Sequence, residues 1–319
     1  MYYFIYLIKA VAVILISNSH LNGFYPSDAL AAGGSLGNVL FFLCSGYLLK
    51  NIKQPFLKWY KKRFIRLYLP YWIFFIFYGF FVPLIFNISD LFKIYLFPTK
   101  CWFISAIACF YVGYYIIFST KIKKYFKVLF SGFILTYLLC YILFADKTIW
   151  YVESDGYFKW LFYFPILILG GYLDEIKIKK LNQKKLVVIN IVSFTFFFGI
   201  KIMFQINEFF YCFQFMTQLF SLLWGLSFFY ICQKNEKHIS NKKTSPLIRF
   251  TTVVANASLE IYITQGLAIK IAKQIIFPLN VLLAFVGMIF TGIVLKLIID
   301  CIYKLLANIK TNKEKNNGK

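Results

Sequence analysis

The sequence predicts an all-α fold, a polytopic membrane helix bundle of about ten transmembrane helices with both termini in the cytoplasm. Of the 319 residues, 61% are apolar and 22% are aromatic, and the mean hydropathy is +0.70. A soluble domain does not need so much apolar surface. Apolar runs of about 20 residues recur along the chain, which is the length of a membrane-spanning helix. The alternating ten-residue segments typical of a β-barrel are absent, which favours helices.

Each apolar run predicts one span. The spans are residues 3–20, 34–50, 67–88, 101–119, 127–145, 159–174, 186–204, 209–232, 250–272 and 279–305. The sixth is short, and we expect Pro165, Gly170 and Gly171 to bend it. Residues 1–305 thus form one membrane domain, and the polar tail 306–319 is expected to be disordered in the cytoplasm.

The basic residues predict the orientation of these spans. Most of the 35 lysines and arginines fall in every second connector and at the C-terminal end. Because lysine and arginine accumulate in cytoplasmic loops, these connectors and both termini are predicted to be cytoplasmic. The connectors are residues 50–66, 119–127, 174–185 and 233–249. The net charge of +23 is therefore spread over loops, and we expect no nucleic-acid partner.

The seven cysteines stand at irregular spacing, and none forms a C-x-x-C pair. Pairs of closely spaced cysteines are typical of metal sites, and regular patterns are typical of disulfide frameworks. The sequence therefore predicts neither a metal site nor a disulfide framework.

The first span carries two ionisable residues, Lys9 and His20, eleven positions apart. That spacing is about three helical turns and about 16 Å, so both lie on nearly the same helix face. An ionisable group in lipid costs roughly 2.5–3.5 kcal/mol, so such groups usually face protein or a wet cavity. His20 is either a general base for an attacking hydroxyl or an ordinary helix-end residue. Lys9 either holds an anion inside the bundle or extends to the cytoplasmic interface.

Three further charged residues are candidates for a site. Arg63 and Arg66 are three positions apart and share one helix face. Two guanidiniums there suit a phosphate, although a basic anchor at the cytoplasmic boundary explains them as well. Glu260 lies within the ninth span, where a carboxylate needs a basic partner from another span. It is either part of a site or one half of a structural ion pair.

Several stretches, taken in order, resemble the acyltransferase-3 family of integral membrane acyltransferases. The resemblance covers about residues 5–305. The matching elements are Lys9 with His20, Phe41-Phe42-x-x-Ser45-Gly46-Tyr47, Arg63-x-x-Arg66 followed by Leu67-x-x-Pro70-Tyr71, Trp102-Phe103-Ile104-Ser105, Phe164-Pro165-x-x-x-x-Gly170-x-Tyr172 and Ser258-x-Glu260-x-Tyr262.

The resemblance implies an enzyme of the bacterial cytoplasmic membrane whose acyltransferase domain is residues 1–305. Such enzymes move an acyl group, usually acetyl from acetyl-CoA, onto a hydroxyl of a carbohydrate or lipid-linked glycan of the cell envelope. The essential histidine of the family maps onto His20, and its companion basic residue maps onto Lys9. Glu260 completes the catalytic candidates, and Arg63 and Arg66 map onto the pair associated with acyl-CoA. The implied partners are acyl-CoA, the glycan acceptor and membrane lipid, with no metal.

Two positions depart from the family pattern. Lys9 keeps the positive charge of the usual arginine but not its planar, bidentate geometry. Gln265 stands where many members carry a histidine. Two other functions also fit the inward-facing charged residues. One is a transporter or flippase, and the other is a non-catalytic component of a polysaccharide export complex.

Overall fold

The computed structural model describes residues 2–81, 95–98, 101–154, 156–176 and 180–317, and these ranges contain helices and no strand. The all-α prediction is confirmed. The α-helices are α1 (Tyr3–Asn18), α2 (Gly34–Leu49), α3 (Phe56–Phe81), α5 (Trp102–Ser119), α6 (Phe126–Phe144), α7 (Gly156–Gly171), α8 (Gln183–Ile206), α9 (Phe215–Lys234), α10 (Glu236–Asn241), α11 (Pro246–Asn256), α12 (Ser258–Ala272) and α13 (Leu279–Asn317). Four 3-10 helices connect them: η1 (Asp28–Leu30), η3 (Lys121–Tyr125), η4 (Val152–Ser154) and η6 (Glu208–Phe213).

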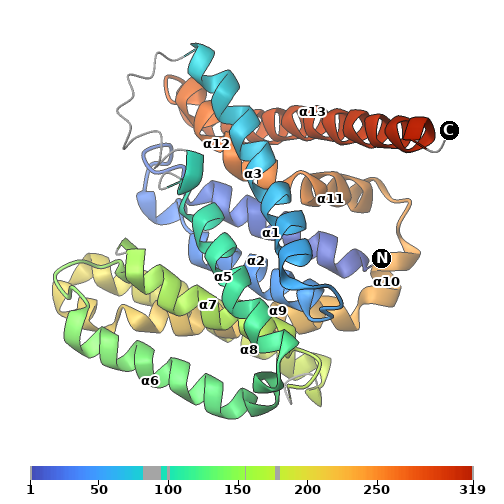
Figure 1. Cartoon of the computed structure of the whole chain (residues 1–319). Helices are drawn as coiled ribbons and strands as arrows, with labels where there is room; N and C mark the ends of the chain where they lie inside the picture. Colours follow the sequence, from blue (N-terminus) through green and yellow to red (C-terminus); the bar gives the residue numbers. More distant parts are fainter. Residues whose placement is uncertain (1, 82–94, 99–100, 155, 177–179, 318–319) are drawn as a thin grey trace.

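Within the described residues, six helical segments are long and apolar enough to cross a membrane. They are Asp28–Leu49, Trp102–Ser119, Lys121–Phe144, Gln183–Ile206, Phe215–Lys234 and Leu279–Asn308. Two shorter apolar helices, Tyr3–Asn18 and Phe158–Gly171, accompany them. The chain is therefore a multi-pass membrane protein, while the count of ten spans and the cytoplasmic termini stay predictions. The N-terminal end of α1 and the C-terminal end of α13 both lie on the right-hand side of Figure 1.

Several element boundaries differ from the predicted spans. The predicted span 250–272 is two helices, because Ala257 (φ −94°, ψ 10°) interrupts the chain between α11 and α12. The predicted span 209–232 begins as the 3-10 helix η6 before α9 starts. Hydropathy detects apolar length but not a local break in backbone conformation, so neither change is visible in the sequence pattern.

Two helices are longer than their predicted spans. α3 begins at Phe56, before the predicted start at residue 67, because its basic first turns are helical although they are not apolar. Residues 82–88 of this predicted span lie outside the described residues. α13 continues to Asn317 and so includes most of the tail 306–319. The tail segment up to Asn317 holds lysine, glutamate and asparagine without a glycine or proline, so no residue in it breaks the helix.

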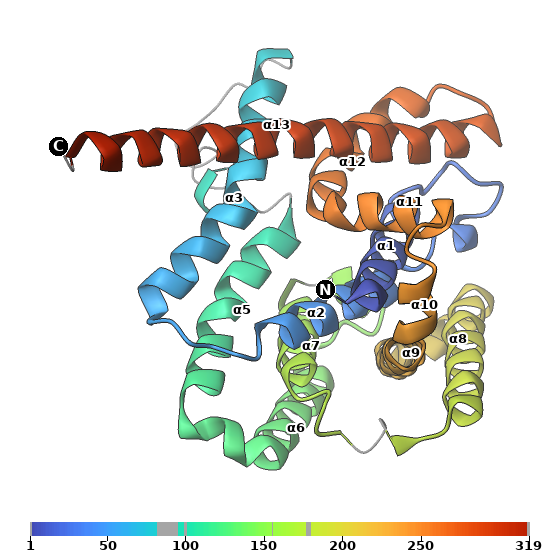
Figure 2. The same cartoon turned by 90° about the vertical axis from the view of Figure 1, so that its right-hand side faces the viewer.

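Helix α2 lies at the centre of the bundle, between α1, α7 and α9 (Figures 1 and 2). Its backbone touches that of α7, because a Cβ added at Gly46 would overlap the carbonyl oxygen of Leu167. The reciprocal contact is made by Gly170, whose added Cβ would overlap the carbonyl oxygen of Leu43. Small residues allow membrane helices to approach this closely. Tyr114 of α5 also donates a hydrogen bond of 2.7 Å to the carbonyl oxygen of Gly46.

A hydrogen-bonded loop joins α1 to α2. The side-chain amide of Asn18 donates to the carbonyl oxygens of Leu30 and Ala32 at 2.7 and 2.9 Å. Its oxygen accepts a hydrogen bond of 2.6 Å from the hydroxyl of Tyr25. One side chain at the end of α1 therefore organises the loop that follows it, and this loop carries His20.

The close α2–α7 contact predicts that a single added methyl group destabilises the protein. Gly46→Ala should lower the stability of the purified protein by about 1–3 kcal/mol, because the added Cβ has no space. The unfolding temperature in detergent measures this loss. Gly199→Ala on α8 is the matched control, since nothing lies within 4 Å of its added Cβ. An unchanged unfolding temperature for Gly46→Ala would show that the two backbones can separate at little cost.

Candidate active site

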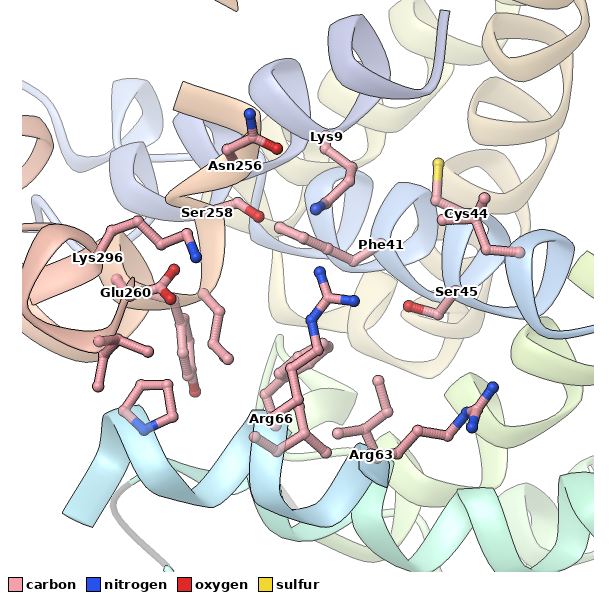
Figure 3. A pocket seen from close by; sticks show the side chains of 18 of the residues that line it. Lys9, Phe41, Cys44, Ser45, Arg63, Arg66, Asn256, Ser258, Glu260 and Lys296 are labelled. Atoms are coloured by element: carbon pink, nitrogen blue, oxygen red, sulfur yellow. The ribbon is translucent and has the colours of Figure 1, made fainter. Parts of the chain in front are cut away.

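A cavity of about 820 Å³ lies between α1, α2, α3, α5, α12 and α13 (Figure 3). Four helices supply its charged lining residues, which are Lys9, Lys62, Arg63, Arg66, Glu260 and Lys296. Four of the five predicted site residues thus line one cavity, although they come from three separate helices. The basic groups outnumber the single carboxylate, so the cavity is electropositive and suits an anionic ligand.

Lys9 projects from α1 into this cavity, as Figure 3 shows. Its neighbours Ile8 and Ala10 are buried in the two hydrophobic clusters that flank α1. This packing fixes the rotation of α1 about its axis, and the ammonium faces the cavity.

The two arginines of α3 line the same cavity but point in different directions (Figure 3). Arg66 extends toward Lys9, whereas Arg63 lies over the ring of Trp59 at 3.9 Å and donates from Nη1 to the Trp59 carbonyl oxygen at 3.0 Å. The cation–π contact and the hydrogen bond both hold the guanidinium of Arg63 against Trp59, which lies one helical turn earlier. The Nε of Arg63 is buried and has no hydrogen-bond partner within the described part of the chain.

Glu260 lies in the first turn of α12, directly after the break at Ala257. A carboxylate is stabilised at that position, because the N-terminal end of a helix carries partial positive charge. The side chain is 5% exposed and lies beside Lys296 in the cavity (Figure 3). The helix break therefore directs the carboxylate of Glu260 toward cations from other helices.

Three aromatic rings form part of the cavity lining. Phe103 lines the cavity and packs against Phe41 and Tyr262, with ring centroids 5.8 and 5.6 Å apart. On its other side Phe103 meets Trp102 at 6.2 Å, and the ammonium of Lys159 lies 5.3 Å from the Trp102 ring. We call Phe41, Phe103 and Tyr262 the aromatic wall.

His20 lies outside the cavity. It is exposed and is not one of the residues that line the cavity, whereas Ile16, one helical turn earlier, does line it. The buried side chain of Leu21 anchors the loop next to it. The structure therefore brings Lys9, Arg63, Arg66 and Glu260 together and leaves His20 separate.

Comparison with protein families adds to this geometry. The sequence profile of the acyltransferase-3 family, described as an acyltransferase domain, matches residues 2–301. The chain belongs to the acyltransferase-3 family. No curated protein and no solved structure matches it significantly. With its apolar helices, this acyltransferase-3 chain is a membrane protein that carries an acyltransferase domain.

This acyltransferase-3 chain also contains a buried carboxylate that the sequence patterns did not single out. Glu153, in η4, is 1% exposed. Its oxygens accept hydrogen bonds from the hydroxyls of Tyr151 at 3.1 Å and Tyr163 at 2.9 Å, and from the Gln218 amide at 3.4 Å. This hydrogen-bond network links α9 to the connector that precedes α7. A lone glutamate in a loop gives no sequence signal of burial.

Lys296 lines the cavity, although its position in the site was not predicted. The sequence does contain an indication of this role. Asp300 follows Lys296 by four residues within an apolar span, and opposite charges at that spacing share one helix face. The side of the helix that faces the cavity depends on the packing of α13, which sequence spacing does not define.

Glu153 predicts a dependence of stability on pH. Burial raises the pKa of Glu153 above its ordinary value of 4.5, although the hydrogen bonds from Tyr163, Gln218 and Tyr151 oppose the shift. The folded protein therefore binds this proton more tightly, and the stabilisation it contributes is present below pH 4.5 and lost as pH rises through the raised pKa.

The variant Glu153→Gln cannot titrate at this position. We expect the unfolding temperatures of the wild type and Glu153→Gln to be similar below pH 4.5 and the wild type to become the less stable of the two toward neutral pH. Thermal unfolding in detergent across this range measures the difference. The opposite trend would mean that the hydrogen bonds to the ionised carboxylate outweigh its burial.

Proposed function

We propose that the protein is an O-acyltransferase that moves an acetyl or similar short acyl group from cytoplasmic acyl-CoA to a hydroxyl of an exported or cell-surface glycan. The observation that carries this proposal is the electropositive cavity, in which Lys9, Arg63 and Arg66 line about 820 Å³ of space. Membership of the acyltransferase-3 family supplies the reaction class. The donor, the acceptor and the bacterial cytoplasmic membrane are parts of the proposal.

The donor is polar and carries several negative charges, so it enters from the side where it is made. The basic first half of α3 and the positive-inside rule support an opening of the cavity toward the cytoplasm. Arg63 and Arg66 then bind the pyrophosphate of acyl-CoA, since guanidinium groups suit phosphate oxygens. Lys9 lines the same cavity, and in this proposal its ammonium stabilises negative charge on the thioester oxygen.

The proposed reaction transfers the acyl group from CoA in the cavity to an acceptor hydroxyl at His20. The acceptor hydroxyl attacks the acyl carbon, its new C–O bond forms as the C–S bond breaks, and CoA leaves as the thiolate. His20 takes the hydroxyl proton as general base. Because His20 lies outside the cavity, the acyl group has to leave the cavity to reach it, and in this proposal it does so past Phe41, Phe103 and Tyr262. Both a direct transfer and a relay through an acyl-enzyme fit this arrangement.

His20→Ala should reduce acetylation at least a hundredfold, as is usual for loss of a general base, without loss of membrane insertion. Transfer of radiolabel from acetyl-CoA to glycan in isolated membranes measures the activity. His238→Ala is the matched control, because His238 is exposed on α10 and away from the cavity. Retained transfer in His20→Ala would rule out His20 as the base, and movement of substrate without covalent change would favour a transporter.

Arg66→Met should weaken the binding of CoA by about tenfold to a hundredfold, since a charge-assisted hydrogen bond is worth about 1.5–3 kcal/mol. Titration of the purified protein with CoA gives the dissociation constant. Lys58→Met removes a positive charge from the exposed face of the same helix and should leave binding nearly unchanged. Equal losses in both variants would point to general electrostatic attraction in place of a specific contact.

A further inference from the structure

The last helix, α13, carries a charged pair within an apolar segment. The Nζ atom of Lys296 donates to Oδ1 of Asp300 at 2.6 Å. Either residue facing lipid would be costly. Lys296 instead lines the cavity, together with Ile299 and Tyr303, which are three and seven positions later on the same helix face. This face of α13 is therefore one wall of the cavity.

Helix stability alone does not account for the pair. The favourable order of an i, i+4 pair places the acid before the base, and here the base comes first. The side chains of Lys296 and Asp300 are 28% and 47% exposed, and ion pairs with such exposure add little stability. An ammonium has three N–H donors, and the bond to Asp300 uses one of them. The cavity side of Lys296 can therefore contact a ligand.

The cations of the cavity lie on different walls. Arg63 and Arg66 project from α3, whereas Lys296 projects from α13 next to Glu260 (Figure 3). A ligand that spans these walls can place an anionic group on each of them. The arrangement fits a ligand with two separate anionic groups. CoA has this property, because its pyrophosphate and its 3′-phosphate are attached to different positions of the ribose.

We propose that Lys296, positioned by Asp300, binds the 3′-phosphate of the CoA donor, an assignment that rests on the proposed function. The two guanidiniums of α3 suit the extended pyrophosphate, whereas a single ammonium acts as a compact point charge for a monophosphate. Asp300 holds the amine at the cavity wall by its hydrogen bond. This contact selects CoA thioesters over donors without a 3′-phosphate, such as 3′-dephospho-CoA thioesters.

The test compares two ligands and two proteins. CoA and 3′-dephospho-CoA are titrated separately into the purified wild type and into Lys296→Met, and four dissociation constants are measured. The wild type should bind CoA about tenfold more tightly than 3′-dephospho-CoA, because one charge-assisted contact is lost. Lys296→Met should bind both ligands equally, with the affinity that the wild type has for 3′-dephospho-CoA.

Two further variants complete the test. Lys304→Met removes an exposed lysine of the same helix that does not line the cavity, and it should keep the tenfold preference. Lys296→Arg should retain most of the preference because the charge is kept. If Lys296→Met does not fold, Asp300→Asn replaces it and should reduce the preference, since the amine is no longer held.

The outcomes separate this inference from the proposed function. Equal binding of both ligands by the wild type, or an unchanged preference in Lys296→Met, would overturn the assignment of Lys296 while leaving the CoA donor intact. A wild type that binds neither ligand would overturn the donor itself, and with it the proposed function.

Discussion

The backbone contact between α2 and α7 is the constraint on which the site depends. Gly46 and Gly170 let the two helices touch, and Tyr114 ties α5 to the same carbonyl group of α2. In a membrane, helices gain little from the hydrophobic effect when they associate, so close packing and hydrogen bonds must hold them. Because α2 also packs against α1, this contact fixes Ser45 and Lys9 relative to each other on the cavity wall.

The cavity itself depends on an interruption of regular structure. Were residues 250–272 one straight helix, α11 and α12 would share an axis; the break at Ala257 lets them diverge, and Asn256, Ser258 and Glu260 line the cavity around it. Charged residues within a membrane protein are costly unless they face protein or water. By turning Lys9, Arg66 and Lys296 toward one shared cavity, the bundle removes each of them from lipid. The same arrangement creates the positive potential that favours an anionic donor.

The aromatic wall is part of a cavity that holds the cations and Glu260, whereas His20 lies outside that cavity. In the proposed reaction the donor and the acceptor occupy different sides of the membrane, so an open passage would also let water and ions through. In that proposal, closely packed rings such as Phe103 and Tyr262 are the side chains that would limit such a leak.

Apolar length and the spacing of Lys9, Arg63, Arg66 and Glu260 are local properties, so the helical membrane fold, the family and most of the cavity's charged residues could be predicted from the sequence. Which of these residues meet depends on how the helices pack. That packing brought Lys296 into the cavity, turned Arg63 onto Trp59, buried Glu153 and left His20 outside the cavity. The physical reason is that the rotation and breaks of each helix follow from packing against its neighbours, and a hydropathy pattern contains no information about those neighbours.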